Sequence, residues 1–250
     1  MPATGRPVGM ARPAGSVFKA GNAVLFDLDD TLADRDRARD RFFSFLLDTY
    51  FPELKRGGTP WSERMDTLRG LDRAGRGSKA AIHDYLFGER PVRLVRPVMP
   101  ATAFVELMRS KIASYTSWSE GAEPLLRCLQ ARKHPLAVVT NGSKSQRDKI
   151  EALEASRYFE AVLISGEVGI AKPDPRIFRQ ALSRLNAAPG RSVFVGDSME
   201  HDIAGARKAG MMTVYIKKGE AEDPDDALCD LVVSDLRELS DLVIGLDACT

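Results

Sequence analysis

Short apolar runs that recur along the chain, each followed by small or polar residues, constrain the fold of this sequence more than any other feature. From residue 22 onward these runs are rich in Val, Ile, Leu and Phe, a composition typical of strands buried on both faces of a parallel sheet. The predicted strands are Ala23–Phe26, Leu136–Val139, Ala161–Ile164, Ser192–Val195 and Thr213–Ile216, with Leu231–Val233 as a sixth candidate.

Segments with helical periodicity lie between these runs. Apolar residues spaced near the helical repeat form one face from Ala122 to Leu129 and another from Ile177 to Leu185. Strand and helix therefore alternate along the chain. This alternation predicts an α/β fold built on a doubly wound, Rossmann-like parallel sheet.

The connection after the first predicted strand is far longer than a single crossover helix needs. Residues 79–87 and 101–115 have helical patterns, no strand-like alternation appears, and a further helical repeat involves Phe42, Phe43, Leu46, Leu47 and Tyr50. We therefore predict that residues 34–119 form a small all-helical domain inserted into an α/β core domain of residues 22–33 and 120–250. In the alternative, these helices only cover one edge of the sheet.

The N-terminal segment, the hydrophobic runs and the cysteines indicate where the protein is located. Residues 1–21 are rich in Pro, Gly and Ala, contain no apolar run of signal-peptide length, and are predicted to be a flexible extension. No later stretch is long enough to span a bilayer, and the three cysteines form no C-x-x-C pair, so a cytoplasmic location is expected.

A formal net charge of +1 gives no electrostatic reason to expect nucleic acid or a membrane as a partner. A small-molecule ligand is the default expectation, and the oligomeric state stays open.

Polar side chains follow several of the predicted strands at the point where each strand ends. Residues 27–31 follow the first strand, residues 140–142 the second, and residues 196–202 the fourth, while residues 172–175 come after the third. In open α/β sheets, ligands bind beyond the carboxyl ends of the strands. We therefore expect carboxylates, a hydroxyl, an amide and one ammonium group on a single rim.

The chemical types of these side chains indicate a metal-assisted reaction on a phosphate. Clustered carboxylates repel one another unless a cation is present, and an all-oxygen ligand set suits Mg²⁺. Lys172 can neutralise charge on the phosphate oxygens, and Thr140 and Asn141 can donate hydrogen bonds to the same oxygens. The sequence therefore predicts a magnesium site that binds a phosphate group.

These four stretches resemble, in order and in residue type, the motifs of the haloacid dehalogenase-like superfamily over about residues 23–216. The resemblance implies that Asp27 is the nucleophile that attacks phosphorus and that Asp29 is the general acid and then the general base. It also implies that Asp27, the backbone carbonyl of Asp29, and Asp197 hold the magnesium ion. Asp202 would act through water or by orienting Lys172. An aspartate at position 29 favours phosphoryl transfer over removal of halide.

The predicted function is that of a magnesium-dependent phosphatase, a phosphoric monoester hydrolase, acting through an aspartyl phosphate. Its expected substrate is a small phosphorylated metabolite, either a sugar phosphate or a nucleoside monophosphate, in a site closed by the inserted domain as a cap. Splitting hydrolysis into formation and breakdown of a covalent intermediate replaces one hard step by two easier ones. Two alternatives stay open: a phosphomutase of the same superfamily, and a non-catalytic protein that binds a phosphate ligand. No phosphate-binding loop of the nucleotide triphosphatases or dinucleotide-binding proteins follows any predicted strand.

Several candidate residues also have an ordinary structural explanation. Lys172 could be a surface lysine beside a turn, Asp202 a helix cap, and Thr140 with Asn141 the end of a strand and the start of a turn. The arginines at positions 35, 37, 39 and 41 could reach an anionic substrate, but we favour a solvated helix face for them.

Overall fold

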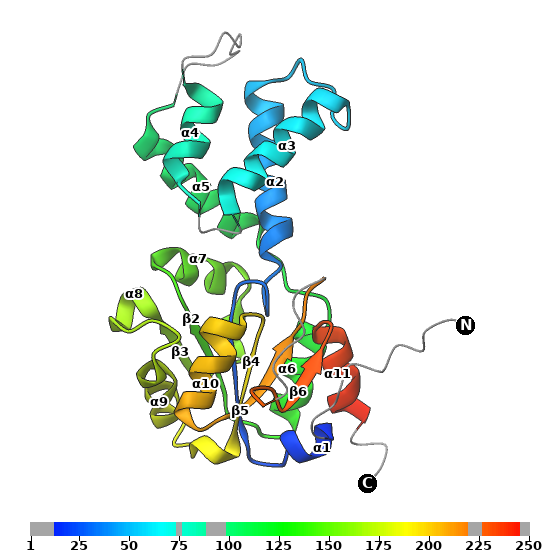
Figure 1. The fold of residues 1–250 in the computed structure, drawn as a ribbon, viewed down its shortest axis with the longest axis vertical. Helices are drawn as coiled ribbons and strands as arrows, with labels where there is room; N and C mark the ends of the chain where they lie inside the picture. The colour runs from blue at the N-terminus through cyan, green and yellow to red at the C-terminus, as the bar shows by residue number, and fades with distance from the viewer. Residues whose placement is uncertain (1–12, 74–76, 89–98, 220–226, 246–250) are drawn as a thin grey trace, which may run out of the picture. The chain divides into compact units, whose positions relative to one another are not determined.

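The computed structural model describes residues 13–73, 77–88, 99–219 and 227–245. Its contacts divide the chain into two compact units (Figure 1). One unit, here called the core unit, comprises Met1–Asp34 and Trp118–Thr250, and the other, here called the helical unit, is Arg35–Ser117.

The core unit contains a 6-stranded sheet in which every neighbouring pair is parallel. Its strands, in the spatial order β3-β2-β1-β4-β5-β6, confirm the predicted α/β class and doubly wound sheet. Each predicted strand is present: β1 (Ala23–Phe26), β2 (Leu136–Thr140), β3 (Ala161–Ile164), β4 (Ser192–Gly196), β5 (Met212–Ile216) and β6 (Leu231–Val233). The chain order reverses beside β1, which lies between β2 and β4, and such a switch point opens a crevice at the carboxyl ends of the strands.

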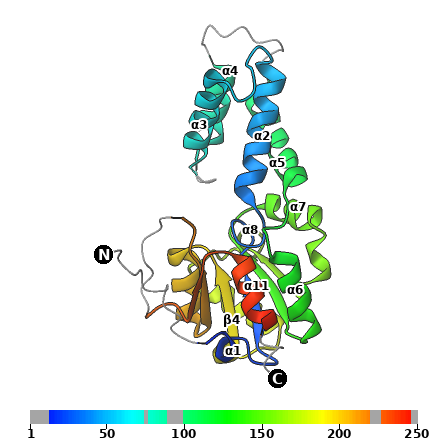
Figure 2. The same cartoon turned by 90° about the vertical axis from the view of Figure 1, so that its right-hand side faces the viewer.

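Helices cover both faces of this sheet, which explains the continuous apolar runs of the strands. Along β1, Val24 and Phe26 join one hydrophobic cluster, and Ala23 and Leu25 join a second cluster on the opposite face. In Figures 1 and 2, α6 and α11 lie side by side against the first of these faces. The second face is covered by α9 and α10. The helices of the core unit are α1 (Ala14–Val17), α6 (Ala122–Ala131), α7 (Lys144–Ala152), α8 (Ser165–Val168), α9 (Pro175–Arg184), α10 (Ala204–Ala209) and α11 (Leu236–Gly245), with short turns η2 (Ala155–Arg157), η3 (Pro189–Arg191) and η4 (Met199–Ile203).

The predicted flexible extension is wrong for the residues around α1. Val17 and Phe18 are buried in the same cluster as β1, and the Asn22 side-chain amide donates to Val17 O at 3.1 Å. These apolar side chains and the buried Ala14 anchor the short segment, a signal that the average composition of residues 1–21 concealed. Residues 1–12 of the predicted extension lie outside the described residues.

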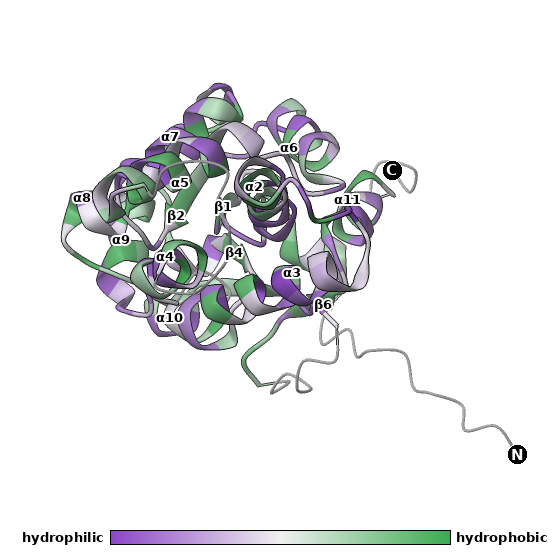
Figure 3. Ribbon diagram, turned by 90° about the horizontal axis from the view of Figure 1, so that it is seen from above, coloured by the Kyte–Doolittle hydropathy of each residue, from purple (hydrophilic) through white to green (hydrophobic). Residues whose placement is uncertain are grey.

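The helical unit has its own hydrophobic core. It contains α2 (Arg35–Tyr50), α3 (Thr59–Asp72), α4 (Lys79–Phe87) and α5 (Ala101–Tyr115), and no strand among its described residues. Phe42, Leu46 and Phe104 are fully buried in one cluster of this unit. Hydrophobic and hydrophilic residues both occur along the helices in Figure 3, as amphipathic helices require. Among the described residues, no helix combines the length and apolar character that crossing a membrane would demand.

The arginines of α2 do not share one environment. Arg37 and Arg41 are exposed, as expected of a solvated face. That expectation is wrong for Arg35 and Arg39, whose side chains are only 12% and 11% exposed. Arg35 Nη2 lies 2.9 Å from Asp72 Oδ2, and Arg39 Nη1 lies 3.9 Å from the same oxygen. These two guanidinium groups compensate a buried carboxylate on α3, which would otherwise carry an unpaired charge inside the helical unit.

Candidate active site

Two aspartates emerge side by side from the centre of the sheet. Asp27 follows β1, and its backbone N–H donates to Val195 O in β4 at 3.0 Å. Asp197 follows β4, and its carboxylate accepts a hydrogen bond from the Thr31 hydroxyl at 3.3 Å. Because β1 and β4 are adjacent and parallel, their carboxyl ends meet at the same edge. The predicted Asp27 and Asp197 therefore share one site, and Thr31, the last residue of the predicted 27–31 stretch, contacts Asp197 there.

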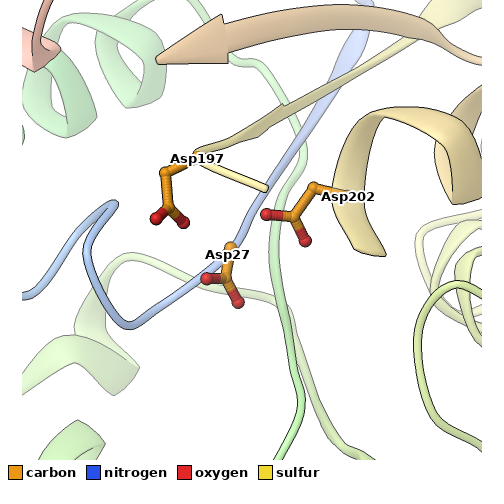
Figure 4. A group of neighbouring side chains, drawn as sticks. All are labelled: Asp27, Asp197 and Asp202. Atoms are coloured by element: carbon orange, nitrogen blue, oxygen red, sulfur yellow. The ribbon is translucent and has the colours of Figure 1, made fainter. Parts of the chain in front are cut away.

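A third carboxylate, that of Asp202, joins them from the single π-helical turn η4. Figure 4 shows the three aspartates around one space, and one oxygen of each lies within 4.8 Å of the others. Asp202 Oδ2 accepts a hydrogen bond from Ser198 N–H at 3.1 Å, and Asp202 is 1% exposed. A side chain at Gly196 would overlap the Asp202 carboxylate, so the close approach requires glycine at that position.

Lys172 supplies a buried positive charge to this group. Its Nζ lies 2.5 Å from Asp27 Oδ1 and 2.7 Å from Asp202 Oδ1, and the residue is only 4% exposed. The alternative of a surface lysine is therefore wrong. The Asn141 side chain forms hydrogen bonds with both backbone polar groups of Lys172. Its Oδ1 accepts from Lys172 N–H at 2.8 Å, and its Nδ2 donates to Lys172 O at 2.9 Å.

The side chains of Asp29 and Thr140 form hydrogen bonds with residues of α7. Lys149 Nζ lies 2.6 and 2.7 Å from the two oxygens of Asp29. Gln146 Nε2 donates to Asp29 Oδ2 at 3.1 Å and to Thr140 Oγ1 at 2.8 Å. Neither Gln146 nor Lys149 was among the predicted site residues. Their signal was a lysine three positions after a glutamine, on the helix that follows the Thr140–Gly142 stretch, which places both side chains on one helix face.

Comparison with known proteins identifies the family. The sequence pattern of the haloacid dehalogenase-like hydrolases matches residues 22–210. The chain belongs to this family. The matched range contains all seven predicted site residues, from Asp27 to Asp202.

Several proteins similar to this chain are named phosphatases. A glyceraldehyde 3-phosphate phosphatase of Methanopyrus kandleri is 33% identical over 230 residues, which cover 88% of this chain and 96% of that protein. A phosphoserine phosphatase of Thermus thermophilus is 44% identical over 119 residues, 47% of this chain and 48% of that protein. The crystal structure of a phosphatase of the same superfamily from Thermococcus onnurineus superposes with a TM-score of 0.60 at 25% identity, covering 90% of this chain and 98% of that one. The hydrolase is thus a phosphoric monoester hydrolase.

The charge balance of the hydrolase site favours a divalent cation. Asp27, Asp197 and Asp202 bring three negative charges when ionised, and Lys172 brings one positive charge. Burial raises the pKa of Asp27 above its ordinary value, and the Asp202 and Asp197 carboxylates raise it further, although Lys172 opposes them. Burial followed by the Asp202 charge raises the pKa of Asp197 to about 6. Three carboxylates with uncompensated charge form a donor set that a hard divalent metal ion fits.

The raised pKa values predict how the stability of the metal-free protein depends on pH. The Asp197 carboxyl titrates near 3.9 in an unfolded chain and at about 6 in the folded protein. Between these values the folded state binds more protons than the unfolded state, so ionisation favours unfolding. In the presence of a chelator, we expect the contribution of Asp197 to the free energy of unfolding to decline as the pH rises through this window.

Urea unfolding of wild type and of Asp197→Asn, measured in EDTA at a series of pH values, checks this expectation. The difference between the two proteins cancels the titrating groups that do not interact with Asp197, and removal of the Asp197 charge also lowers the raised pKa of Asp27, which acts in the same direction. The variant should gain stability relative to wild type as the pH rises from about 4 to about 7. A difference that is constant across this range, or that changes in the opposite direction, would show that the pKa of Asp197 is not raised in the folded protein.

Proposed function

We propose that this hydrolase removes the phosphate group from a small phosphorylated metabolite, a sugar phosphate or a nucleoside monophosphate, in a magnesium-dependent reaction through an aspartyl phosphate on Asp27. The observation that carries the proposal is the approach of the Asp27, Asp197 and Asp202 carboxylates to within 4.8 Å, with the Lys172 ammonium 2.5 Å from Asp27 Oδ1. An oxygen nucleophile, a cation site and a fixed positive charge meet at one point. This combination suits attack on a phosphate.

In this proposal, Asp27, Asp197 and the backbone carbonyl of Asp29 hold Mg²⁺. The ion supplies positive charge that lets a carboxylate approach a phosphate dianion. Asp202 lies 2.7 Å from the Lys172 ammonium and keeps it in place beside Asp27. Lys172 then stabilises negative charge on the phosphoryl oxygens.

The proposed reaction has two steps that use the same two aspartates. In the first, an Asp27 oxygen bonds to phosphorus, the bond from phosphorus to the leaving oxygen breaks, and Asp29 gives that oxygen a proton. In the second, Asp29 takes a proton from water, the water oxygen bonds to phosphorus, and the bond from Asp27 breaks. The products are an alcohol and inorganic phosphate. Thr140 and Asn141 contribute hydrogen bonds to the phosphoryl oxygens, in addition to the contacts they make with Gln146 and Lys172.

The substrate class and the role of the helical unit belong to the same proposal. Relatives named as acting on glyceraldehyde 3-phosphate, phosphoserine and ribulose 1,5-bisphosphate support a small phosphorylated substrate. The chain leaves the core unit after Asp34 and returns at Trp118, which forms a bridge with Ala33. We propose that residues 34–119 act as a cap domain that selects the leaving group. A cytoplasmic location and the lack of a nucleic-acid partner stay predictions.

Phosphate release from an aryl phosphate tests the proposed function. The metal-free protein should be inactive, and added Mg²⁺ should raise the rate by on the order of a hundredfold or more, because the ion supplies several kcal/mol of charge stabilisation. Asp197→Asn should need a higher Mg²⁺ concentration for half-maximal activity than wild type. Equal rates with EDTA and with Mg²⁺ would contradict the proposal.

A substrate panel then addresses the class of the leaving group. Glyceraldehyde 3-phosphate, phosphoserine, ribulose 1,5-bisphosphate and nucleoside monophosphates cover the named relatives and the predicted classes. A small metabolite should give a kcat/KM well above that of the aryl phosphate, since only it can use contacts to the leaving group.

A further inference from the structure

Two side chains of α7 hold Asp29 within the core unit. Lys149 Nζ contacts both Asp29 oxygens at 2.6 and 2.7 Å, and Gln146 Nε2 contacts one of them at 3.1 Å. Lys149 is 7% exposed and Gln146 is 3% exposed. The Asp29 carboxylate is therefore fixed by three contacts from one helix face.

The local backbone makes room for this arrangement. Gly142 has a φ of +146°, and a Cβ at this position would lie 2.7 Å from Gln146 Cγ. A larger residue would displace the Gln146 side chain from its place between Thr140 Oγ1, at 2.8 Å, and Asp29. The glycine of the Thr140–Gly142 stretch thus serves the α7 contacts to Asp29 as well as the turn.

The Lys149 ammonium is directed at a single carboxylate. Within the described residues, Asp29 is the only carboxylate with which Lys149 forms an ion pair. A buried ammonium is costly unless it is paired, and here its partner is the proposed proton donor and acceptor. Contacts to both oxygens fix the plane of the carboxylate as well as its position, and proton transfer is sensitive to such geometry.

We propose that Lys149, assisted by Gln146, is a positioning residue that orients Asp29 for proton transfer. This inference rests on the proposed function, because Asp29 matters only if it moves protons in the reaction. In this proposal Lys149 acts through Asp29, whose two oxygens it contacts, and has no direct role at the phosphate or the metal. Its effect should therefore be confined to the steps that need Asp29.

The time course of an aryl phosphate with a good leaving group separates these steps. A nitrophenolate leaves without a proton, so the first turnover does not need Asp29, whereas breakdown of the aspartyl phosphate needs it as a base. With Lys149→Met, the first-turnover burst of nitrophenol should keep its wild-type rate within about twofold. The steady-state rate after the burst should fall by about tenfold to a hundredfold, within the range attributed to general base catalysis.

Three further variants complete the experiment. Asp29→Asn should show the same pattern with a larger loss in steady state, and Gln146→Met the same pattern with a smaller one. Lys144→Met, an exposed lysine on the same helix, is the matched control and should behave as wild type. Circular dichroism of each variant checks that it is folded.

The outcomes distinguish this inference from the proposed function. Equal slowing of burst and steady state by Lys149→Met, or no slowing of either, overturns the positioning role while a requirement for Asp27 still stands. If Asp27→Asn releases phosphate as fast as wild type, the proposed function itself fails.

Discussion

Replacement of Asp27 by asparagine should reduce phosphate release by at least about a thousandfold, since removal of an enzyme nucleophile costs this much or more. The amide is almost the same size as the carboxylate, and its oxygen can still accept from Lys172, which lies 2.5 Å from Asp27 Oδ1. The surrounding structure therefore has little reason to change. An amide oxygen is a much weaker nucleophile than a carboxylate, so the covalent step is the one that should be lost.

Acid quenching with radiolabelled substrate measures this step directly. Wild type should carry label on the protein during turnover, and Asp27→Asn should carry none. The matched control is Asp241→Asn, an exposed aspartate on α11 of the same unit, which should retain the wild-type rate and the label. Retention of more than a tenth of the wild-type rate by Asp27→Asn would place the nucleophile elsewhere.

The sheet and the residues at its edge could be predicted because strands buried on both faces have apolar sequences, which can be recognised without knowledge of the rest of the chain. Each strand of the core is built mainly from apolar residues, and Ala23–Phe26 is apolar and buried at every position. Once the strands are placed, the residue after each one must lie on the same rim. Asp27 and Asp197 needed no knowledge of distant contacts to be brought together.

The contacts of Asp29 could not be predicted in this way. Asp29 and Lys149 are 120 positions apart, and α7 has the polar sequence of an ordinary solvated helix. Whether a lysine on such a helix faces solvent or a carboxylate depends on how the helix packs, which no local pattern records. The same limit applies to Arg35, whose partner Asp72 lies 37 positions away on α3.

The average composition of a segment is a poor predictor of its structure where a few residues decide how the segment packs. Pro, Gly and Ala dominate residues 1–21, yet the buried Ala14, Val17 and Phe18 anchor the segment around α1 to the core. The helix α3 was also not predicted, although Pro60 stands in its first turn, a favoured position for proline, and Met65 and Leu68 are buried three residues apart.

Substitution of Lys172 by methionine should damage both stability and catalysis. Burial alone would lower the pKa of Lys172, but the Asp202 and Asp27 carboxylates raise it above its ordinary value. A group whose pKa is raised on folding contributes stability that is fully present below its unfolded pKa, so at neutral pH the whole contribution is at stake. Methionine would leave Asp27 and Asp202, which are 8% and 1% exposed, without their positive partner. Removal of one partner from a buried ion pair costs about 3–5 kcal/mol.

Urea unfolding of Lys172→Met in EDTA should show a loss of about 3 kcal/mol at neutral pH, at the lower end of that range, because the carboxylates can take up protons to reduce the cost. The loss should shrink at acidic pH, where the carboxyl groups are protonated, and also on addition of Mg²⁺, which replaces part of the missing charge. Turnover at saturating Mg²⁺ should still be at least about a hundredfold below wild type, because charge on the phosphoryl oxygens is no longer stabilised.

The matched control is Lys218→Met: its ammonium lies 3.3 Å from Asp30 and its side chain is 50% exposed. An exposed pair contributes less than about 1 kcal/mol, so this variant should unfold nearly as wild type does. If Lys172→Met unfolds at the same urea concentration as wild type at neutral pH in EDTA, the lysine does not compensate the buried carboxylates, and the charge balance that favours a divalent ion at this site is wrong.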